Sequence, residues 1–186
     1  MHLSRMHAHS YNINNLLAIN RTKMQNFTIK SVNIPAIKIP QIKISIKLTA
    51  VMSFEEQSQL TCSNDCYQVF KHCFNHDTFH WREELVLICL TRANTPIGFY
   101  SISSGGISGT FADPKVIFTT ALKAGAASIA IAHNHPSGNL KPSEADKHLT
   151  KQLIKAGKYL DIPVVDHLIL TAHSYFSFAD NGLMTC

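Results

Sequence analysis

The sequence contains no continuous apolar run that approaches the roughly 18 residues of a membrane-spanning helix, although 45% of its 186 residues are apolar. Near its start it also lacks the short apolar stretch and small-residue cleavage site of a secretory signal. The length suits one ordinary domain plus an extension, and the apolar fraction suits a well-packed core. We therefore expect a soluble, cytoplasmic protein that has no membrane partner.

An even, regularly spaced set of cysteines is missing too. Five cysteines stand at positions 62, 66, 73, 89 and 186, so a disulfide framework is not indicated. Cys89 lies in an apolar run and is expected to be a buried thiol. The first three cysteines lie near histidines at positions 72, 76 and 80, but their spacing matches no zinc finger or ribbon. We favour a helix with small apolar thiols on one side over a second metal site.

Acidic residues are absent from residues 1–50, which hold seven Lys or Arg. Residues 51–186 hold ten basic and twelve acidic residues, so the net charge of +5 belongs to the N-terminal part. A nucleic-acid-binding domain would be expected to have a basic surface of its own. We therefore expect a nucleic-acid partner only through this basic arm, residues 1–50, and we place the globular domain at residues 53–186.

Two parts of the basic arm differ in pattern. Residues 1–24 are polar and weakly periodic, and we expect them to be disordered. Residues 33–49 alternate apolar and polar side chains as a half-buried strand does, but Pro35 and Pro40 exclude a central position in a sheet. An edge strand, a segment that pairs with another chain and an extended linker remain as alternatives, which leaves the oligomeric state open.

Helix and strand signals alternate along the globular domain. Ser63 is a suitable N-cap for a first helix, Asp113-Pro114 is a strong start for a second that ends at Gly125, and Ser143 begins a third. The apolar faces of the last two helices are expected to be Val116, Ile117, Ala121 and Ala124, and Leu149, Leu153, Ile154 and Leu160. Strands are expected at residues 85–90, 97–103, 128–132 and 162–171. Strands joined by both hairpins and helices predict an α/β domain with a mixed β-sheet flanked by helices.

Residues 133–146, HNHPSGNLKPSEAD, carry the chemistry. His133 and His135 stand two apart at the end of a strand, so both rings point to the same side. A loop with two prolines and a glycine follows, and Asp146 falls in the first turn of the next helix, where a carboxylate gains from the helix dipole. Two nitrogens and one oxygen are three protein ligands of the kind that a catalytic zinc site uses, with water in the fourth position. The expected cofactor is Zn²⁺, with a nearby Glu as the proton carrier.

The pattern H-x-H-x₇-S-x₂-D, formed by His133, His135, Ser143 and Asp146, resembles the JAMM, or MPN-plus, metalloprotease motif. Taken alone, the Ser and Asp would indicate only a capping box. Residues 60–182 more closely resemble the RadC-like JAB domain of bacteria, in the stretches SSGGISGTFADPKVIFTTALKAGA, AHNHPSGNLKPSEAD and AGKYLDIPVVDHLILT. The resemblance implies a JAB/MPN architecture, which is layered like that of cytidine deaminases. The helix-hairpin-helix DNA-binding module of many full-length members has no counterpart in these 186 residues.

The resemblance also implies roles for individual residues. His133, His135 and Asp146 would bind zinc, and Ser143 would hold the substrate carbonyl or the developing oxyanion. The implied activity is that of a zinc peptidase or isopeptidase that uses a metal-activated water on a protein or peptide substrate.

A Glu on an earlier strand is implied as the general acid and base. In the family it precedes the final apolar position of that strand, here Leu90, by seven residues, which indicates Glu83. Glu84 is the alternative, because neighbouring residues on a strand point to opposite faces and only one of the two can reach the metal.

Other polar residues support weaker expectations. Asp166 and His167 would either hydrogen-bond near the ligands or form a satisfied structural pair. Asn134 is expected to face away from the ligands and to hold the loop, and His148 to face solvent. The glycines at 105, 106 and 109 fit either a close backbone approach to the site or a plain turn.

Three functions compete at this stage. A zinc peptidase or isopeptidase is the first. A DNA-repair role, suggested by the family's historical name, is the second, and the acidic balance of the globular domain opposes it. The third is a metal-loaded binding module without turnover, which nothing in the sequence favours. A deaminase-type zinc site needs H-x-E and P-C-x-x-C, and the sequence contains neither.

Overall fold

Five strands form one mixed sheet in the computed structural model, which describes residues 59–105 and 112–185. The elements in chain order are α1 (Ser63–Cys73), β1 (Glu84–Leu90), β2 (Pro96–Ser104), α2 (Pro114–Ala124), β3 (Ser128–Asn134), α3 (Glu144–Leu160), β4 (Val164–Leu170) and β5 (Tyr175–Ser177). The strand order is β2-β1-β3-β4-β5, and β3 and β4 form the one parallel pair in these ranges. This arrangement confirms the expected α/β class with a mixed sheet.

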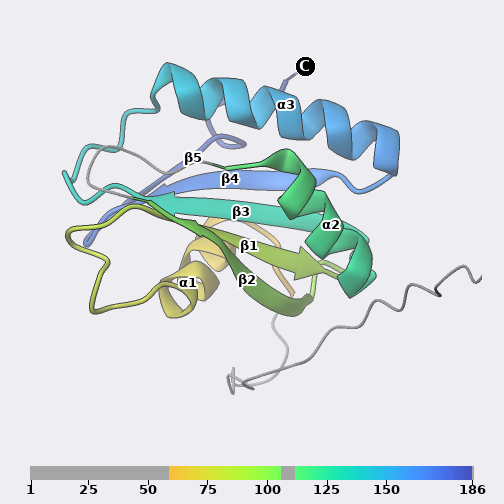
Figure 1. Ribbon diagram of the computed structural model, residues 1–186, viewed down its shortest axis with the longest axis horizontal. Helices are drawn as coiled ribbons and strands as arrows, with labels where there is room; N and C mark the ends of the chain where they lie inside the picture. The colour runs from red at the N-terminus through yellow and green to blue at the C-terminus, as the bar shows by residue number, and fades with distance from the viewer. Residues whose placement is uncertain (1–58, 106–111, 186) are drawn as a thin grey trace, which may run out of the picture. The chain divides into compact units, whose positions relative to one another are not determined.

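Helices cover both faces of the sheet, as Figure 1 shows, with α1 on one side and α2 and α3 on the other. Both faces of β3 are buried along its whole length, which explains its unbroken run of small and apolar residues. None of the helices in the described ranges is long and apolar enough to cross a membrane.

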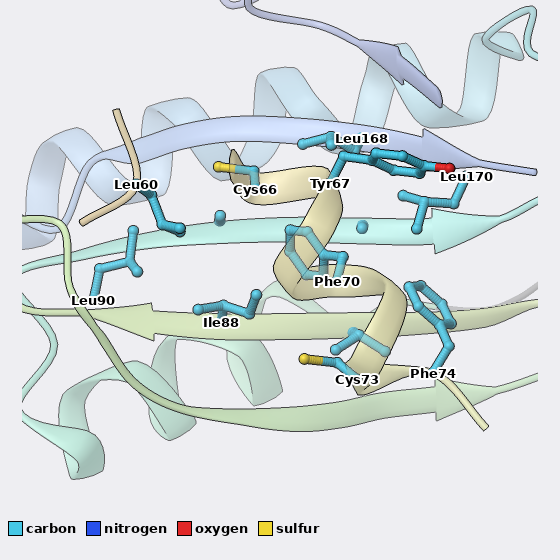
Figure 2. Close-up of a cluster of buried hydrophobic side chains, with 13 residues drawn as sticks. Leu60, Cys66, Tyr67, Phe70, Cys73, Phe74, Ile88, Leu90, Leu168 and Leu170 are labelled. Atoms are coloured by element: carbon cyan, nitrogen blue, oxygen red, sulfur yellow. The ribbon is translucent and has the colours of Figure 1, made fainter. Parts of the chain in front are cut away.

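The face under α1 is packed with aromatic and aliphatic side chains (Figure 2). Phe70 of α1 is fully buried there, against a cluster that includes Ile88, Leu90 and Leu168. Burying a side chain of this size stabilises the fold by roughly 1.5–3 kcal/mol. The thiols of Cys66 and Cys73 belong to the same cluster, which confirms the expected apolar thiols for these two, whereas Cys62 is exposed at the N-cap of the helix.

The opposite face packs β1 and β3 against α2 and α3. Its buried members include Leu85, Ile117, Ile131 and Leu153. Gly157 on α3 lies so close to the chain that follows the helix that an added Cβ would stand 2.5 Å from the carbonyl oxygen of Ile162. A residue without a side chain is therefore needed where α3 meets the start of β4.

Several expected details were wrong. Cys62, not Ser63, is the N-cap of α1, because the Asp65 carboxylate reaches back to the backbone N–H of Cys62. Val116 and Leu160 are 41% exposed instead of belonging to the apolar faces of their helices. The last long strand begins at Val164 rather than at residue 162, because the N–H of residue 162 still bonds to the end of α3.

Other expectations hold or fall outside the described ranges. Asp113 caps α2 with Pro114 in its first turn, and the helix ends on Gly125 at φ 65°. The short strand β5 had no counterpart in the sequence analysis. The expectations for residues 1–24 and 33–49, for a domain start near residue 53, and for glycines 106 and 109 all lie outside the described residues.

Candidate metal centre

The predicted ligands come from two places in the fold. His133 lies near the end of β3, His135 follows the strand directly, and Asp146 occupies the first turn of α3. One ligand atom from each residue lies within 4.8 Å of the others, and no second group of this kind occurs in the ranges that the structure describes. The loop between β3 and α3 therefore brings together the three residues that the sequence analysis selected.

The distances fit a tetrahedral ion. The Nε2 atoms of His133 and His135 are 3.0 Å apart, and the Asp146 carboxylate lies 3.4 Å from the first and 4.0 Å from the second. Ligand atoms around a tetrahedral zinc ion stand roughly 3.3 Å apart. His135 Nδ1 lies 2.6 Å from the carbonyl oxygen of Asn139, so it carries a proton to donate. A neutral His135 then presents a bare Nε2, and the donor set suits a divalent cation.

Burial favours the neutral form of His133, the most buried of the three candidate ligands. Burial lowers the pKa of His133 to about 4, the nearby carboxylate of Asp146 opposes this change, and His135 adds to it. A neutral imidazole has a lone pair to offer a metal at neutral pH.

Behind His133 lies a buried polar pair. His167 Nε2 stands 2.9 Å from His133 Nδ1, and the Thr150 hydroxyl of α3 stands 2.7 Å from His167 Nδ1. Burial lowers the pKa of His167 well below its ordinary value, and the neighbouring His133 and His135 lower it further. Of the two roles considered for His167, the structure shows the contact with a candidate ligand, His133. Thr150 was missed, although a polar residue four positions after Asp146 on the apolar side of the helix was a usable signal.

The Asp166 carboxylate bonds to backbone and side-chain groups around β5, not to the candidate ligands. Its carboxylate accepts hydrogen bonds from the Ser177 hydroxyl and from the backbone N–H groups of Ala179 and His167. Burial raises its pKa, which these hydrogen bonds counteract. Asp166 therefore fastens the chain after β5 to β4, and it does not contact the ligands.

Ser143 forms the capping box of α3. Its hydroxyl donates to Asp146 Oδ2 at 2.7 Å and accepts from the Asp146 backbone N–H at 3.1 Å, while its own N–H donates to the same carboxylate oxygen. The capping reading of the Ser-x-x-Asp pattern is confirmed. The hydroxyl also touches a ligand, which places it at the edge of the site.

The two candidate glutamates differ in their surroundings. Glu84 opens β1, and its carboxylate accepts from the Ser101 hydroxyl and from the Asn75 backbone N–H. Glu83 directly precedes the strand instead of lying on it, and it is half-buried. Leu85 pairs with His133 in the antiparallel ladder, and Glu83 precedes Leu85 by two residues.

Asn134 was expected to hold the loop that follows it, but its hydrogen bonds go to a different segment. It is fully buried, and its side chain bonds to the segment before β1 instead of to its own loop. Its oxygen accepts from the Glu84 N–H, and its amide donates to the carbonyl oxygens of Phe79 and Arg82. His148 faces solvent as expected.

A cavity of about 440 Å³ opens beside the ligands. His135 lies in its wall, together with Phe79, His80, Leu140 and His173. Apolar surface and imidazole groups thus line a space next to the candidate centre.

Comparison with known proteins identifies relatives of this domain. The family model described as the RadC-like JAB domain matches residues 60–183. A UPF0758 protein of Flavobacterium johnsoniae is 38% identical over 125 residues, which are 67% of this chain and 53% of the relative. A UPF0758 protein of Salinibacter ruber is 36% identical over 130 residues, 70% of this chain and 54% of the relative. The UPF0758 protein YfjY of Escherichia coli is 41% identical over 103 residues, 55% of this chain and 64% of the relative. The chain thus spans about half the length of the first two relatives.

Proposed function

The chain belongs to the RadC-like JAB domain family, and from that premise we propose that it is a zinc-dependent hydrolase, a peptidase or isopeptidase. One observation carries the proposal: His133, His135 and Asp146 converge with ligand atoms within 4.8 Å of one another. Three protein ligands with a free fourth position are typical of catalytic rather than structural zinc sites.

The residues divide the work as follows. His133, His135 and Asp146 would hold the ion, which would supply a water of lowered pKa and polarise the substrate carbonyl. Glu83 would take a proton from the attacking water and return it to the leaving amine. Ser143 would turn its hydroxyl toward the substrate and donate to the carbonyl oxygen as negative charge develops there.

Glu83 is favoured over Glu84 by two observations. Glu83 lies two residues before Leu85, the partner of His133 in the β1–β3 ladder, whereas the carboxylate of Glu84 bonds to Ser101 and Asn75 near the end of α1. If the chain stays extended through Glu83, its carboxylate would share the face of Leu85 and point away from that of Glu84.

The test uses the purified full chain, supplied with zinc, against libraries of peptides and of isopeptide-linked peptides, with cleavage read by mass spectrometry. We expect Glu83→Gln to lose turnover by about 100-fold or more while it retains metal. Glu84→Gln is the matched control and should stay within a few-fold of the wild type. Full activity in Glu83→Gln would overturn the role of Glu83. Loss of activity in Glu84→Gln, but not in Glu83→Gln, would assign the role to Glu84.

A nucleic-acid function is the second candidate, because residues 1–50 hold seven basic and no acidic residues. Such a segment attracts phosphate groups without reading sequence. Oligonucleotide binding that weakens with salt and disappears when residues 1–50 are removed would assign this role to the arm. Binding that survives their removal would instead assign it to the globular domain.

A further inference from the structure

A chain of hydrogen bonds leads from the backbone of α3 through the core to His133. The Thr150 hydroxyl lies 2.7 Å from the carbonyl oxygen of Asp146 and 2.7 Å from His167 Nδ1. His167 Nε2 in turn lies 2.9 Å from His133 Nδ1. Thr150 and His167 are at most 1% exposed, so no water competes for these bonds.

The direction of each proton follows from the first bond. A carbonyl oxygen has no proton to give, so the Thr150 hydroxyl must donate to Asp146. Because the only hydroxyl proton of Thr150 is used in this bond, the Thr150 oxygen can only accept a hydrogen bond from His167. His167 therefore carries its proton on Nδ1.

The proton position on His167 in turn determines the tautomer of His133. A fully buried imidazole without an acidic partner is neutral, so a His167 protonated on Nδ1 has a bare Nε2 that accepts. The proton between the two rings must then belong to His133 Nδ1, and His133 Nε2 faces His135 with its lone pair free. The opposite tautomer would aim an N–H at His135 Nε2, 3.0 Å away, and fill the space between the ligands.

We propose that Thr150 and His167 are positioning residues that fix the tautomer and the ring orientation of His133, so that its Nε2 lone pair is preset toward a metal ion. His135 obtains the same result by another route, from the carbonyl oxygen of Asn139. The Phe178 ring stacks on His167, with centroids 4.5 Å apart and planes 10° from parallel, and holds it from the side. We call this series of hydrogen bonds, from the Asp146 carbonyl through Thr150 and His167 to His133, the relay. Because it begins at the backbone of Asp146, it also connects the turn that carries the third candidate ligand to His133.

The inference concerns the same centre and rests on the proposed metal binding, but the tautomer can be measured without metal. The first test records long-range ¹⁵N–¹H correlations of the histidine rings in the metal-free full chain, with signals assigned by His133→Asn and His167→Asn. We expect both His133 and His167 to be protonated on Nδ1. A His133 protonated on Nε2 would overturn the relay, even if zinc still binds.

The second test compares zinc affinity, by competition with a chelator, in Thr150→Val and Thr150→Ser. Valine keeps the shape of threonine but removes the hydroxyl, and loss of a partner of this kind weakens metal binding by about 10- to 100-fold. Serine restores the hydroxyl and should keep affinity within a few-fold of the wild type. Equal affinity in Thr150→Val and the wild type, with an unchanged His133 tautomer, would overturn the proposal.

The two tests separate the possible failures. A wild type that binds no zinc but shows the expected tautomers would contradict the proposed function and leave the relay in place as a feature of the fold. If Thr150→Val does not fold, the wild-type spectrum and the serine variant still decide the proposal.

Discussion

The side-chain oxygen of Asn134 accepts a hydrogen bond from the backbone N–H of Glu84 at 2.8 Å, across 50 positions of sequence. Asn134 stands between the two histidine ligands, and Glu84 follows the proposed proton carrier. The contact thus joins the candidate metal centre to the segment that contains Glu83. Because Asn134 also donates to Phe79 and Arg82, one side chain satisfies three backbone groups of that segment.

We expect Asn134→Ala to destabilise the protein and to lower turnover while it retains metal. Each buried group left without a partner costs roughly 1–3 kcal/mol, and the freed segment would no longer hold Glu83 in place. Urea denaturation and zinc content would be measured together. Asn139→Ala is the control, because the Asn139 side chain is exposed and accepts only from the Lys141 N–H. A stability of Asn134→Ala that equals that of Asn139→Ala would contradict the assignment.

Metal content tests the centre directly. We expect about one zinc per chain in the wild type and none in His135→Ala, since two ligands without the third bind weakly. Inductively coupled plasma mass spectrometry gives the ratio. His148→Ala removes an exposed histidine outside the centre and should retain the metal. A wild type that stays free of metal after zinc is offered would refute the assignment as a zinc hydrolase.

Ser143 combines a structural and a chemical role that two substitutions can separate. Ser143→Ala should lose about 1 kcal/mol of stability through the missing cap and about 100- to 1000-fold in kcat through the missing oxyanion donor. Ser143→Asp keeps a capping oxygen for the Asp146 N–H but has no hydroxyl proton to donate. A Ser143→Asp variant that keeps wild-type kcat would show that the hydroxyl acts only as a cap.

The convergence of His133, His135 and Asp146 could be predicted from the sequence because all three residues lie within 14 residues of one continuous motif. Two histidines two apart and an acid at a capped helix start need only local geometry to converge. The α/β class followed for the same reason, since apolar periodicity and helix caps are local signals.

Contacts between distant segments could not be predicted in this way. Thr150 reaches His167 because β4 runs parallel to β3. The order of the strands in the sheet cannot be predicted from the sequence of any single segment. The target of Asn134, 50 positions away for the Glu84 contact, depends on the antiparallel pairing of β1 with β3. The exposure of Val116 likewise depends on where α2 meets the sheet.

The cysteines should differ in reactivity. Burial raises the pKa of Cys66 and Cys73 to about 12 and that of Cys89 to about 11, and thiolates are the reactive form. Cys62 is exposed. At pH 8, iodoacetamide should therefore modify Cys62 in the native protein and spare Cys66, Cys73 and Cys89 until urea is added. Peptide mass spectrometry gives the order, and early modification of Cys89 would contradict the packing of β1.

Acid should destabilise the metal-free protein between pH 6.5 and pH 4. Burial lowers the pKa of His133 from 6.5 to about 4, so in this window the unfolded chain binds a proton that the folded chain does not. Stability rises with pH wherever the unfolded state binds more protons, so the free energy of unfolding falls as the pH drops. Urea denaturation at several pH values, with a chelator present, should show a shallower decline in His133→Asn than in the wild type. His148→Asn, which removes an exposed histidine, should keep the wild-type slope. If His133→Asn declines as steeply as the wild type, His133 takes up its proton in the folded state, and its lone pair is not reserved for a metal.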